Sequence, residues 1–380
     1  MMSTSRKRSG RTWRIVAVSV ILVLGAAAGF VWFGIKSLPP ASAAELDATD
    51  REVFESLTEQ YRAFADNPAD LWTVDYRYDT EPLILIRADS TKSSIWHYVY
   101  VINASAITDV SGMQKIDFPG NPLLDDVYAT KTLGAASLEY WQPLTFTTTT
   151  LGDTPVLAMK YAPGELDGGA DKTLALPTFA LHEAFHINAQ QEWTYDRGEN
   201  VARILDFPSD EAQMDLLRTE FSILDALTGT TDPDVVRPIA RDLLAVRAAR
   251  YERWPALREQ DNTEAIEGTA QYLERRVSEV TGGPIGILTS AAGTPATFTD
   301  VLGWIEEDPS RRVLLERSVY YETGAQLGSA LDVVAPGWKT DIEPLPVGKR
   351  HTPHAALKAA LGDPGSPSEA QLAEIQARYR

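Results

Sequence analysis

Residues 181–192 read Leu-His-Glu-Ala-Phe-His-Ile-Asn-Ala-Gln-Gln-Glu, and within them His182 and His186 stand four positions apart with Glu183 beside the first. Residues four apart share one face of an α-helix, so both imidazoles can bind one zinc ion. Glu183 can then take a proton from a water molecule that the ion activates. The chain has only five histidines, so this spacing is hard to attribute to chance. The alternative is a surface helix with two unrelated histidines.

The helix that carries this pattern is predicted to be buried, because the residues around it are mostly apolar. A buried set of histidine and glutamate side chains costs free energy unless it has a partner, and a metal ion supplies one. Pro177 and Thr178 are typical of a helix start. The apolar residues are Leu174, Leu176, Phe179, Ala180, Leu181, Ala184, Phe185 and Ile187.

A catalytic zinc ion takes three protein ligands and leaves a fourth position for water. A third histidine six residues after the second is excluded, because Glu192 stands there. The remaining option is a glutamate from a second helix, predicted over residues 261–276. Glu264, Glu267 and Glu274 share one face of that helix. The spacing leaves Glu264 and Glu267 open as ligands, and Glu274 is interpreted as part of a solvated face.

At this point the chain resembles the gluzincins, the thermolysin- and aminopeptidase-N-like zinc metallopeptidases. The resemblance rests on the HExxH motif His182-Glu183-x-x-His186 followed by Glu267-Gly268-Thr269-Ala270-Gln271-Tyr272. Many members carry their ligand glutamate just before glycine, in an E-G-x-A-x-Y pattern. The resemblance implies that Glu267 is the third ligand. Glu264 is then the competing ligand, or a group that orients a ligand histidine. The chain departs from the best-known members in its much longer insert between His186 and Glu267.

The resemblance also implies a hydrogen-bond donor for the oxyanion of peptide hydrolysis. Gluzincins often supply a tyrosine or histidine from a helix after the third ligand. Tyr320 and Tyr321 are placed correctly in chain order, and the alternative is that this pair belongs to the core. It further implies that an edge strand near the active cleft, expected at 154–161, binds the substrate backbone.

The other histidines and a basic segment are given structural interpretations. His97 is expected in a strand, and His351 and His354 in surface loops. Residues 233–258 are predicted to be helical and are rich in arginine. They are interpreted as a solvated face paired with nearby acids, with a site for a substrate carboxylate as the alternative. These arginines are Arg237, Arg241, Arg247, Arg250, Arg253 and Arg258.

The amino terminus predicts export. Residues 15–35 carry no charge and are long enough to cross a bilayer, and five basic residues precede them, so the main domain is expected outside the cytoplasm. Ala41-Ser42-Ala43 resembles a cleavage site, so the alternative to a single-pass anchor in the cell membrane is a secreted protein cut near Ala43. The chain has no cysteine and a formal net charge of −18. It therefore lacks disulfides and is not expected to bind nucleic acid.

The expected fold class is α+β, with an N-terminal transmembrane helix and a mixed β-rich region followed by a mainly helical zincin-like metallopeptidase domain. The expected divisions are a cytoplasmic basic arm at 1–14, a transmembrane signal-anchor at 15–35, a tether at 36–49, a β-rich part at 50–161, a helical zinc-peptidase part at 162–345 and a C-terminal tail with a short helix at 346–380. Within the β-rich part, residues 50–66 predict a helix, and 82–87, 96–102 and 154–161 predict strands.

Together these expectations describe a membrane-anchored, extracytoplasmic zinc-dependent metallopeptidase. It would hydrolyse peptide bonds of a peptide or protein substrate through a zinc-activated water, with Zn²⁺ held by His182, His186 and Glu267 and with Glu183 as general base. The alternative is a non-catalytic envelope interaction protein with a zinc-stabilised zincin-like fold. Glu183 favours the enzyme, because a structural zinc ion needs no base and usually has four protein ligands, often cysteines.

Overall fold

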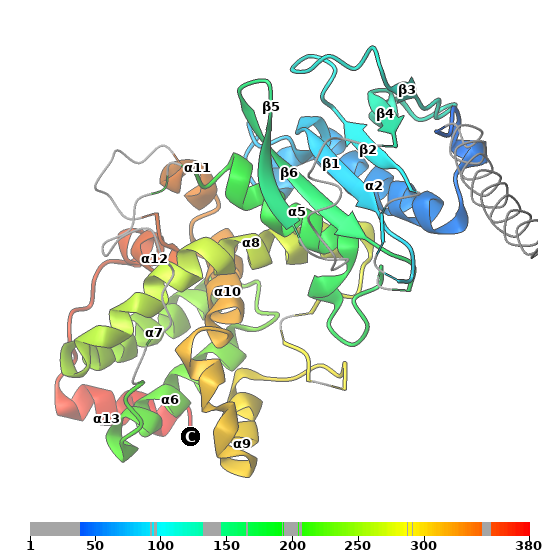
Figure 1. Cartoon of the computed structure of the whole chain (residues 1–380). Helices are drawn as coiled ribbons and strands as arrows, with labels where there is room; N and C mark the ends of the chain where they lie inside the picture. The colour runs from blue at the N-terminus through cyan, green and yellow to red at the C-terminus, as the bar shows by residue number, and fades with distance from the viewer. Residues whose placement is uncertain are drawn as a thin grey trace, which may run out of the picture.

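The computed structural model describes residues 39–380 except 92, 95–96, 132–145, 165, 192, 194–203, 205–206, 287, 291 and 344–350. Figure 1 shows a sheet with its covering helices at one end of the molecule and a helical assembly at the other. The strands are β1 (Leu83–Arg87), β2 (Val99–Ile102), β3 (Gln114–Lys115), β4 (Val127–Thr130), β5 (Phe146–Leu151) and β6 (Thr154–Tyr161). The helices are α2 (Ala48–Asp66), α3 (Pro68–Leu71), α5 (Leu176–Asn188), α6 (Glu211–Leu227), α7 (Pro233–Arg253), α8 (Glu259–Thr281), α9 (Phe298–Glu307), α10 (Val319–Val334), α11 (Trp338–Ile342), α12 (Pro353–Leu361) and α13 (Glu369–Arg378). Short 3₁₀ segments are η1 (Ala43–Glu45), η2 (Tyr78–Thr80), η3 (Pro122–Leu124), η4 (Lys172–Leu174), η5 (Pro255–Arg258) and η6 (Pro309–Glu316).

The sheet is mixed and has the strand order β3-β4-β2-β1-β6-β5. Only β1 and β6 run parallel, with Leu83 opposite Leu157, and β5 and β6 form an antiparallel hairpin. The strand predicted at 154–161 is therefore present as β6, but the expectation that it lies at the edge was wrong. Among the described residues β5 is the edge strand on this side of the sheet, because its only partner is β6, and β3 forms the opposite edge.

The two faces of the sheet are both buried, which explains why β1 and β6 are nearly continuous apolar runs. One face packs Leu83, Leu85, Leu157 and Met159 into the main hydrophobic core. The opposite face carries Ile84, Ile86, Val99, Val156 and Ala158 in a smaller cluster. This alternation follows from the period of two along a strand.

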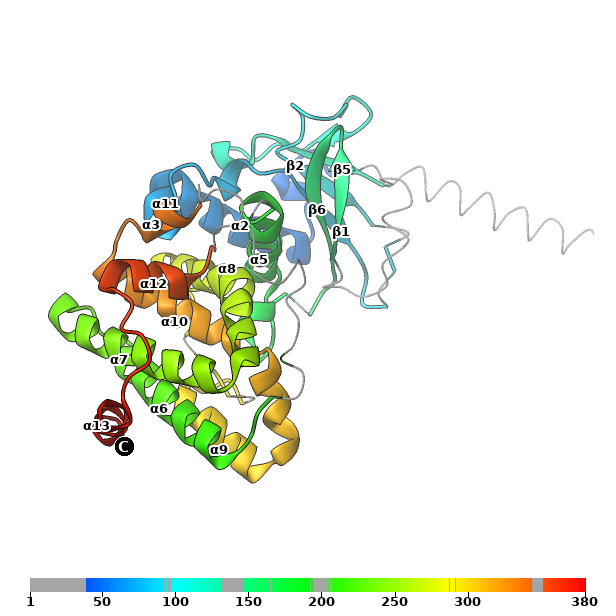
Figure 2. The same ribbon diagram turned by 90° about the vertical axis from the view of Figure 1, so that its left-hand side faces the viewer.

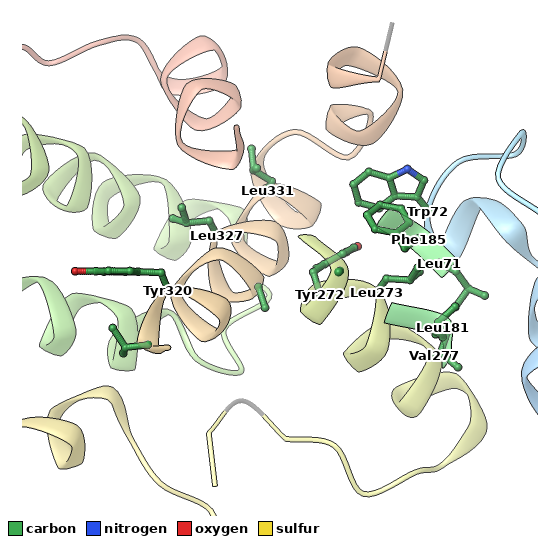
Figure 3. Packing of buried hydrophobic residues seen from close by; sticks show 14 of the residues in the cluster. Leu71, Trp72, Leu181, Phe185, Tyr272, Leu273, Val277, Tyr320, Leu327 and Leu331 are labelled. Atoms are coloured by element: carbon green, nitrogen blue, oxygen red, sulfur yellow. The ribbon is translucent and has the colours of Figure 1, made fainter. Parts of the chain in front are cut away.

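The predicted metal-binding helix is α5, which packs against β6 on one side and α8 on the other. It begins at Leu176 with Pro177 in its first turn, where the missing N–H of proline has no intrahelical partner to lose. Figure 2 shows α5 between the sheet and the helical assembly. Trp72 packs edge-on against Phe185 of α5, with ring centroids 4.9 Å apart, and Figure 3 shows the two rings together near Leu273 of α8.

Helices α8 and α10 meet backbone to backbone. A Cβ atom added to Gly268 of α8 would stand 2.6 Å from the Cα atom of Gly324 in α10, closer than non-bonded atoms approach. Gly324 is equally confined, because its own Cβ would meet the carbonyl oxygen of Glu264 at 2.6 Å. Glycine at both positions therefore sets the distance between the two helices.

The amino terminus requires a correction to the expected fold class. No helix in the described part of the chain is long and apolar enough to cross a bilayer. The expected arm at 1–14 and span at 15–35 lie outside the described residues. The described fold is an α+β fold on a six-stranded mixed sheet. The prediction that a transmembrane helix forms part of this fold was wrong. Part of the expected tether lies against the fold, where Ser42 pairs with Asp117.

The arginines of α7 require a second correction, because Arg247 and Arg250 are fully buried rather than solvated. Arg247 donates through Nε to Glu220 Oε1 at 2.8 Å, and Arg250 donates to the other oxygen of Glu220. Burial alone would raise the pKa of Glu220, but the two guanidinium groups lower it. A basic segment can be buried in this way only when each charge has a partner.

Two histidines expected in surface loops are also buried. His351 is 1% exposed, stacks on the ring of Trp193 and donates through Nδ1 to the carbonyl oxygen of Ile342. His354 is 6% exposed and contacts Asp261 at 2.9 Å. The prediction failed because the partners of these histidines, Trp193, Ile342 and Asp261, lie on other segments of the chain, and local sequence does not show that these segments meet.

Candidate metal centre

The side chains predicted to bind zinc converge at the interface of α5 and α8. His182 Nε2 lies 3.2 Å from Glu267 Oε2, and His186 Nε2 lies 3.5 Å from the same oxygen. Ligand atoms of the three residues all lie within 4.8 Å of one another. One turn of α5 separates the two histidines, which is why their rings meet, with centroids 4.8 Å apart.

Two of the spacings among these donor atoms match those around a tetrahedral metal ion. Two ligand atoms that each lie about 2.0–2.1 Å from a tetrahedral zinc ion are separated by about 3.3 Å. The two nitrogen-to-oxygen distances at the site, 3.2 and 3.5 Å, bracket that value. The donor set of two imidazoles and one carboxylate is also one that zinc takes in catalytic sites.

The electrostatics of the site favour a positive charge. Burial alone would lower the pKa of His182, but the carboxylates of Glu274 and Glu267 raise it to about 10. Burial alone would raise the pKa of Glu267, but its bonds to His182 and His186 hold it far below its usual range. The surrounding carboxylates therefore stabilise a cation at this point, whether a proton or a metal ion.

Each histidine has a side-chain oxygen within hydrogen-bond distance of Nδ1, the ring nitrogen that does not face Glu267. His182 Nδ1 lies 2.5 Å from Glu274 Oε1, and His186 Nδ1 lies 2.6 Å from Gln190 Oε1. An Nδ1–H that donates to oxygen leaves the lone pair of Nε2 directed at the common point, the tautomer that a metal ion requires. Gln190 is fixed in turn by α8, since its Nε2 donates to Thr269 Oγ1 at 2.7 Å.

Glu274 is the clearest error of the sequence interpretation, which assigned it to a solvated face. It is 2% exposed, because α8 turns this face toward α5 rather than toward water. Its position two turns after Glu267 on the same helical face was a usable signal. Gln190 was missed as well, and only its place one turn after His186 pointed to it.

Glu264, the competing ligand in the sequence interpretation, lies away from the histidines. It is fully buried and accepts a bidentate pair of hydrogen bonds from Arg247, at 2.6 and 2.7 Å. Thr323 of α10 donates to it at 2.5 Å. The structure thus brings Glu267 to the two histidines and turns Glu264 toward α7 and α10.

The two tyrosines of α10 point in different directions. Tyr320 is 1% exposed and points from α10 toward the side away from Leu181 of α5 (Figure 3). Tyr321 is half-buried, and its ring lies parallel to that of His182 with centroids 6.2 Å apart. Burial and the nearby carboxylate of Glu267 raise the pKa of Tyr321, so its hydroxyl keeps its proton and can donate it to a hydrogen bond.

Glu183 and Arg317 complete the site. Burial raises the pKa of Glu183, although the charges of His182 and His186 oppose this. Arg317 donates through Nη2 to Glu267 Oε1 at 2.8 Å, and its guanidinium lies 5.6 Å from the centre of the Tyr321 ring. Arg317 carried no sequence signal beyond its position just before the two tyrosines.

The edge strand β5 comes close to α5, the predicted metal-binding helix. Phe146 at the start of β5 packs edge-on against Phe179 of α5, with ring centroids 5.4 Å apart. Phe179 stacks in turn on His182. Phe146 is 39% exposed, so an apolar side chain stands on the strand that forms this edge of the sheet among the described residues, and only the ring of Phe179 separates it from His182.

Comparisons with protein-family models, with curated proteins and with solved structures found no match for this chain. The interpretation of the site therefore depends on its geometry and on the local resemblance of its two motifs to those of gluzincins.

Proposed function

We propose that this chain is a zinc-dependent metallopeptidase. The observation that carries the proposal is the convergence of His182 Nε2, His186 Nε2 and Glu267 Oε2 on one point, with Glu183 next to His182 on the same helix. The contacts of Glu274 Oε1 with His182 and of Gln190 Oε1 with His186 support the proposal, because they orient both imidazoles for a metal ion. A structural zinc site would not need the carboxylate of Glu183.

A bound zinc ion supplies a Lewis acid that polarises the substrate carbonyl and makes a water molecule acidic near neutral pH. Glu183 accepts the proton as the water attacks and then delivers it to the leaving amine, so the proton released by the water ends on the new amino terminus. The raised pKa of Glu183 suits this exchange, since a base works best with a pKa near the working pH.

Two further residues act beside the reacting bond. The hydroxyl of Tyr321 donates a hydrogen bond to the carbonyl oxygen as negative charge develops on it. Arg317 occupies the second oxygen of Glu267, so only one oxygen of that carboxylate faces the histidines. Tyr320 has no part in this step, because it points into the core.

The outer edge of β5 has no strand paired with it among the described residues, and this supports a peptide as the substrate. An extended peptide can add to an exposed strand through backbone hydrogen bonds, with alternate side chains in contact with the protein. The exposed ring of Phe146 would then meet an apolar side chain of the substrate. The substrate-binding strand expected at 154–161 is accordingly replaced by β5.

The decisive test compares the zinc-loaded wild type with Glu183→Gln on a mixture of peptides analysed by mass spectrometry. We expect both proteins to hold close to one zinc ion per chain, and the variant to cleave at least about 10²-fold more slowly. Equal cleavage by both proteins, or no zinc uptake by either, would reject the proposal. Zinc uptake with no cleavage by the wild type would favour a non-catalytic zinc-stabilised protein.

Export of the main domain stays a prediction from residues 1–35, which lie outside the described part of the chain. The test is digestion of intact spheroplasts by added protease. Loss of the main domain before lysis is the expected result, and protection until lysis would contradict it.

A further inference from the structure

Arg317 contacts both the proposed third zinc ligand and the proposed oxyanion donor. It donates through Nη2 to Glu267 Oε1 at 2.8 Å, and its guanidinium carbon lies 5.6 Å from the centre of the Tyr321 ring. Burial raises the pKa of Tyr321, and the carboxylate of Glu267 raises it further, which places this carboxylate near the tyrosine as well. The three side chains are therefore mutual neighbours, although Glu267 belongs to α8 and Tyr321 to α10.

The backbone holds Arg317 at a defined point beside these helices. It directly follows η6 and stands two residues before the start of α10. Its carbonyl oxygen accepts a hydrogen bond from the backbone N–H of Tyr320 at 3.0 Å. The contact with Tyr321, four residues on, is therefore local, whereas Glu267 is 50 residues away in the chain. Arg317 thus joins a local neighbour to a distant one.

An ordinary surface ion pair is the simpler interpretation of this arginine, because its side chain is 38% exposed. Such pairs contribute little to stability. The side chain of Glu267, however, is only 10% exposed, and its other oxygen faces both histidines. The hydrogen bond therefore falls on a buried carboxylate that is proposed to bind the metal ion, and it occupies one of the two oxygens that the ion could use.

We propose that Arg317 is a positioning residue for the reaction, an inference that rests on the proposed function. Its hydrogen bond engages Glu267 Oε1, so that the carboxylate binds the metal ion through Oε2 alone. Its planar guanidinium packs against the ring of Tyr321 and holds the hydroxyl in place for the oxyanion. Arg317 acts through these two residues rather than on the substrate.

The first test is the visible absorption of the full chain loaded with Co²⁺ in place of zinc, which needs no substrate. Zinc affinity would not decide, because loss of the hydrogen bond weakens binding while loss of the positive charge removes its repulsion of the ion. Co²⁺ absorbs more strongly with four ligands than with more. We expect a weaker band in Arg317→Ala, because both oxygens of Glu267 become free to bind. Arg317→Lys should keep the wild-type band, since its ammonium group can still donate to Oε1.

The second test is a double-mutant cycle on kcat with Tyr321→Phe. Arg317→Ala should lower kcat about tenfold in the wild-type background, with little change in KM, because the contact that holds the tyrosine is lost. In the Tyr321→Phe background the loss should be about threefold or less, since the hydroxyl to be positioned is absent. Arg311→Ala is the matched control, because Arg311 is exposed on η6 and contacts Asp308. It should match the wild type in both tests.

Indistinguishable Co²⁺ spectra of the wild type and Arg317→Ala would overturn the proposal, and so would an equal loss of kcat in the two backgrounds. A raised KM with an unchanged kcat would make Arg317 a substrate contact and would also overturn it. A wild type that takes up the metal but cleaves no peptide would reject the proposed function, and the role of Arg317 with it. A wild type that cleaves peptides while the variants give one spectrum would reject the proposal for Arg317 alone.

Discussion

Replacing Glu274 tests whether a residue that does not bind the ion itself supports metal binding by holding the ligand His182. Glu274 Oε1 lies 2.5 Å from His182 Nδ1, and Glu274 is almost fully buried, so Glu274→Ala removes the hydrogen-bond acceptor of this nitrogen. Loss of such an outer partner typically weakens metal binding by 10–100-fold. That corresponds to about 1.4–2.7 kcal/mol of binding free energy.

The assay is competition for zinc against a chromophoric chelator, with the apparent dissociation constant as the readout. Glu274→Gln should lose less than about tenfold, because its amide oxygen can still accept from Nδ1–H. Glu267→Ala should lose far more, since it removes a direct ligand. Glu279→Ala is the control, because Glu279 is exposed on the same helix and pairs only with a neighbouring arginine.

Two results would refute this reasoning. Wild-type zinc affinity in Glu274→Ala would show that His182 needs no outer partner. A loss as large as that of Glu267→Ala would show that Glu274 itself binds the ion, against the geometry described above.

Two further experiments test the roles that the structure gives to Glu264 and to the tyrosine pair. Glu264→Ala should keep its zinc but lose about 3–5 kcal/mol of stability, measured by urea unfolding. The reason is that Arg247 and Arg250, both buried, would then share Glu220 as their one carboxylate partner among the described residues. An unchanged unfolding midpoint would contradict the buried ion pair. Tyr321→Phe should lower kcat by about 10²-fold with little change in KM, whereas Tyr320→Phe should cleave peptides at the wild-type rate. A large loss of kcat in Tyr320→Phe and none in Tyr321→Phe would assign the oxyanion donor to Tyr320 instead.

The local part of the site could be predicted from the sequence. His182, Glu183 and His186 lie within one turn of a helix, so their relation follows from helical geometry alone. The helix predicted at 261–276 lies inside α8, and the motif position of Glu267 distinguished it from Glu264 where spacing did not. These inferences needed no knowledge of how distant segments pack.

The rest depended on which helix faces which. Glu274 and Arg247 read as solvated side chains, because their partners His182 and Glu264 are distant in sequence or on another helix. The edge position of β5 depends on the order of strands, which local alternation does not encode. Arg317 was missed because its partner Glu267 lies on another helix.

The contact between Gly268 and Gly324 links the candidate site to the packing of two helices. No atom larger than hydrogen fits between the two backbones at that crossing, so a side chain at either position would push the helices apart. Glu267 directly precedes Gly268 on α8, and Tyr321 lies three residues before Gly324 on α10. A substitution at either glycine would therefore change the distance between the proposed zinc ligand and the proposed donor to the oxyanion without touching either residue.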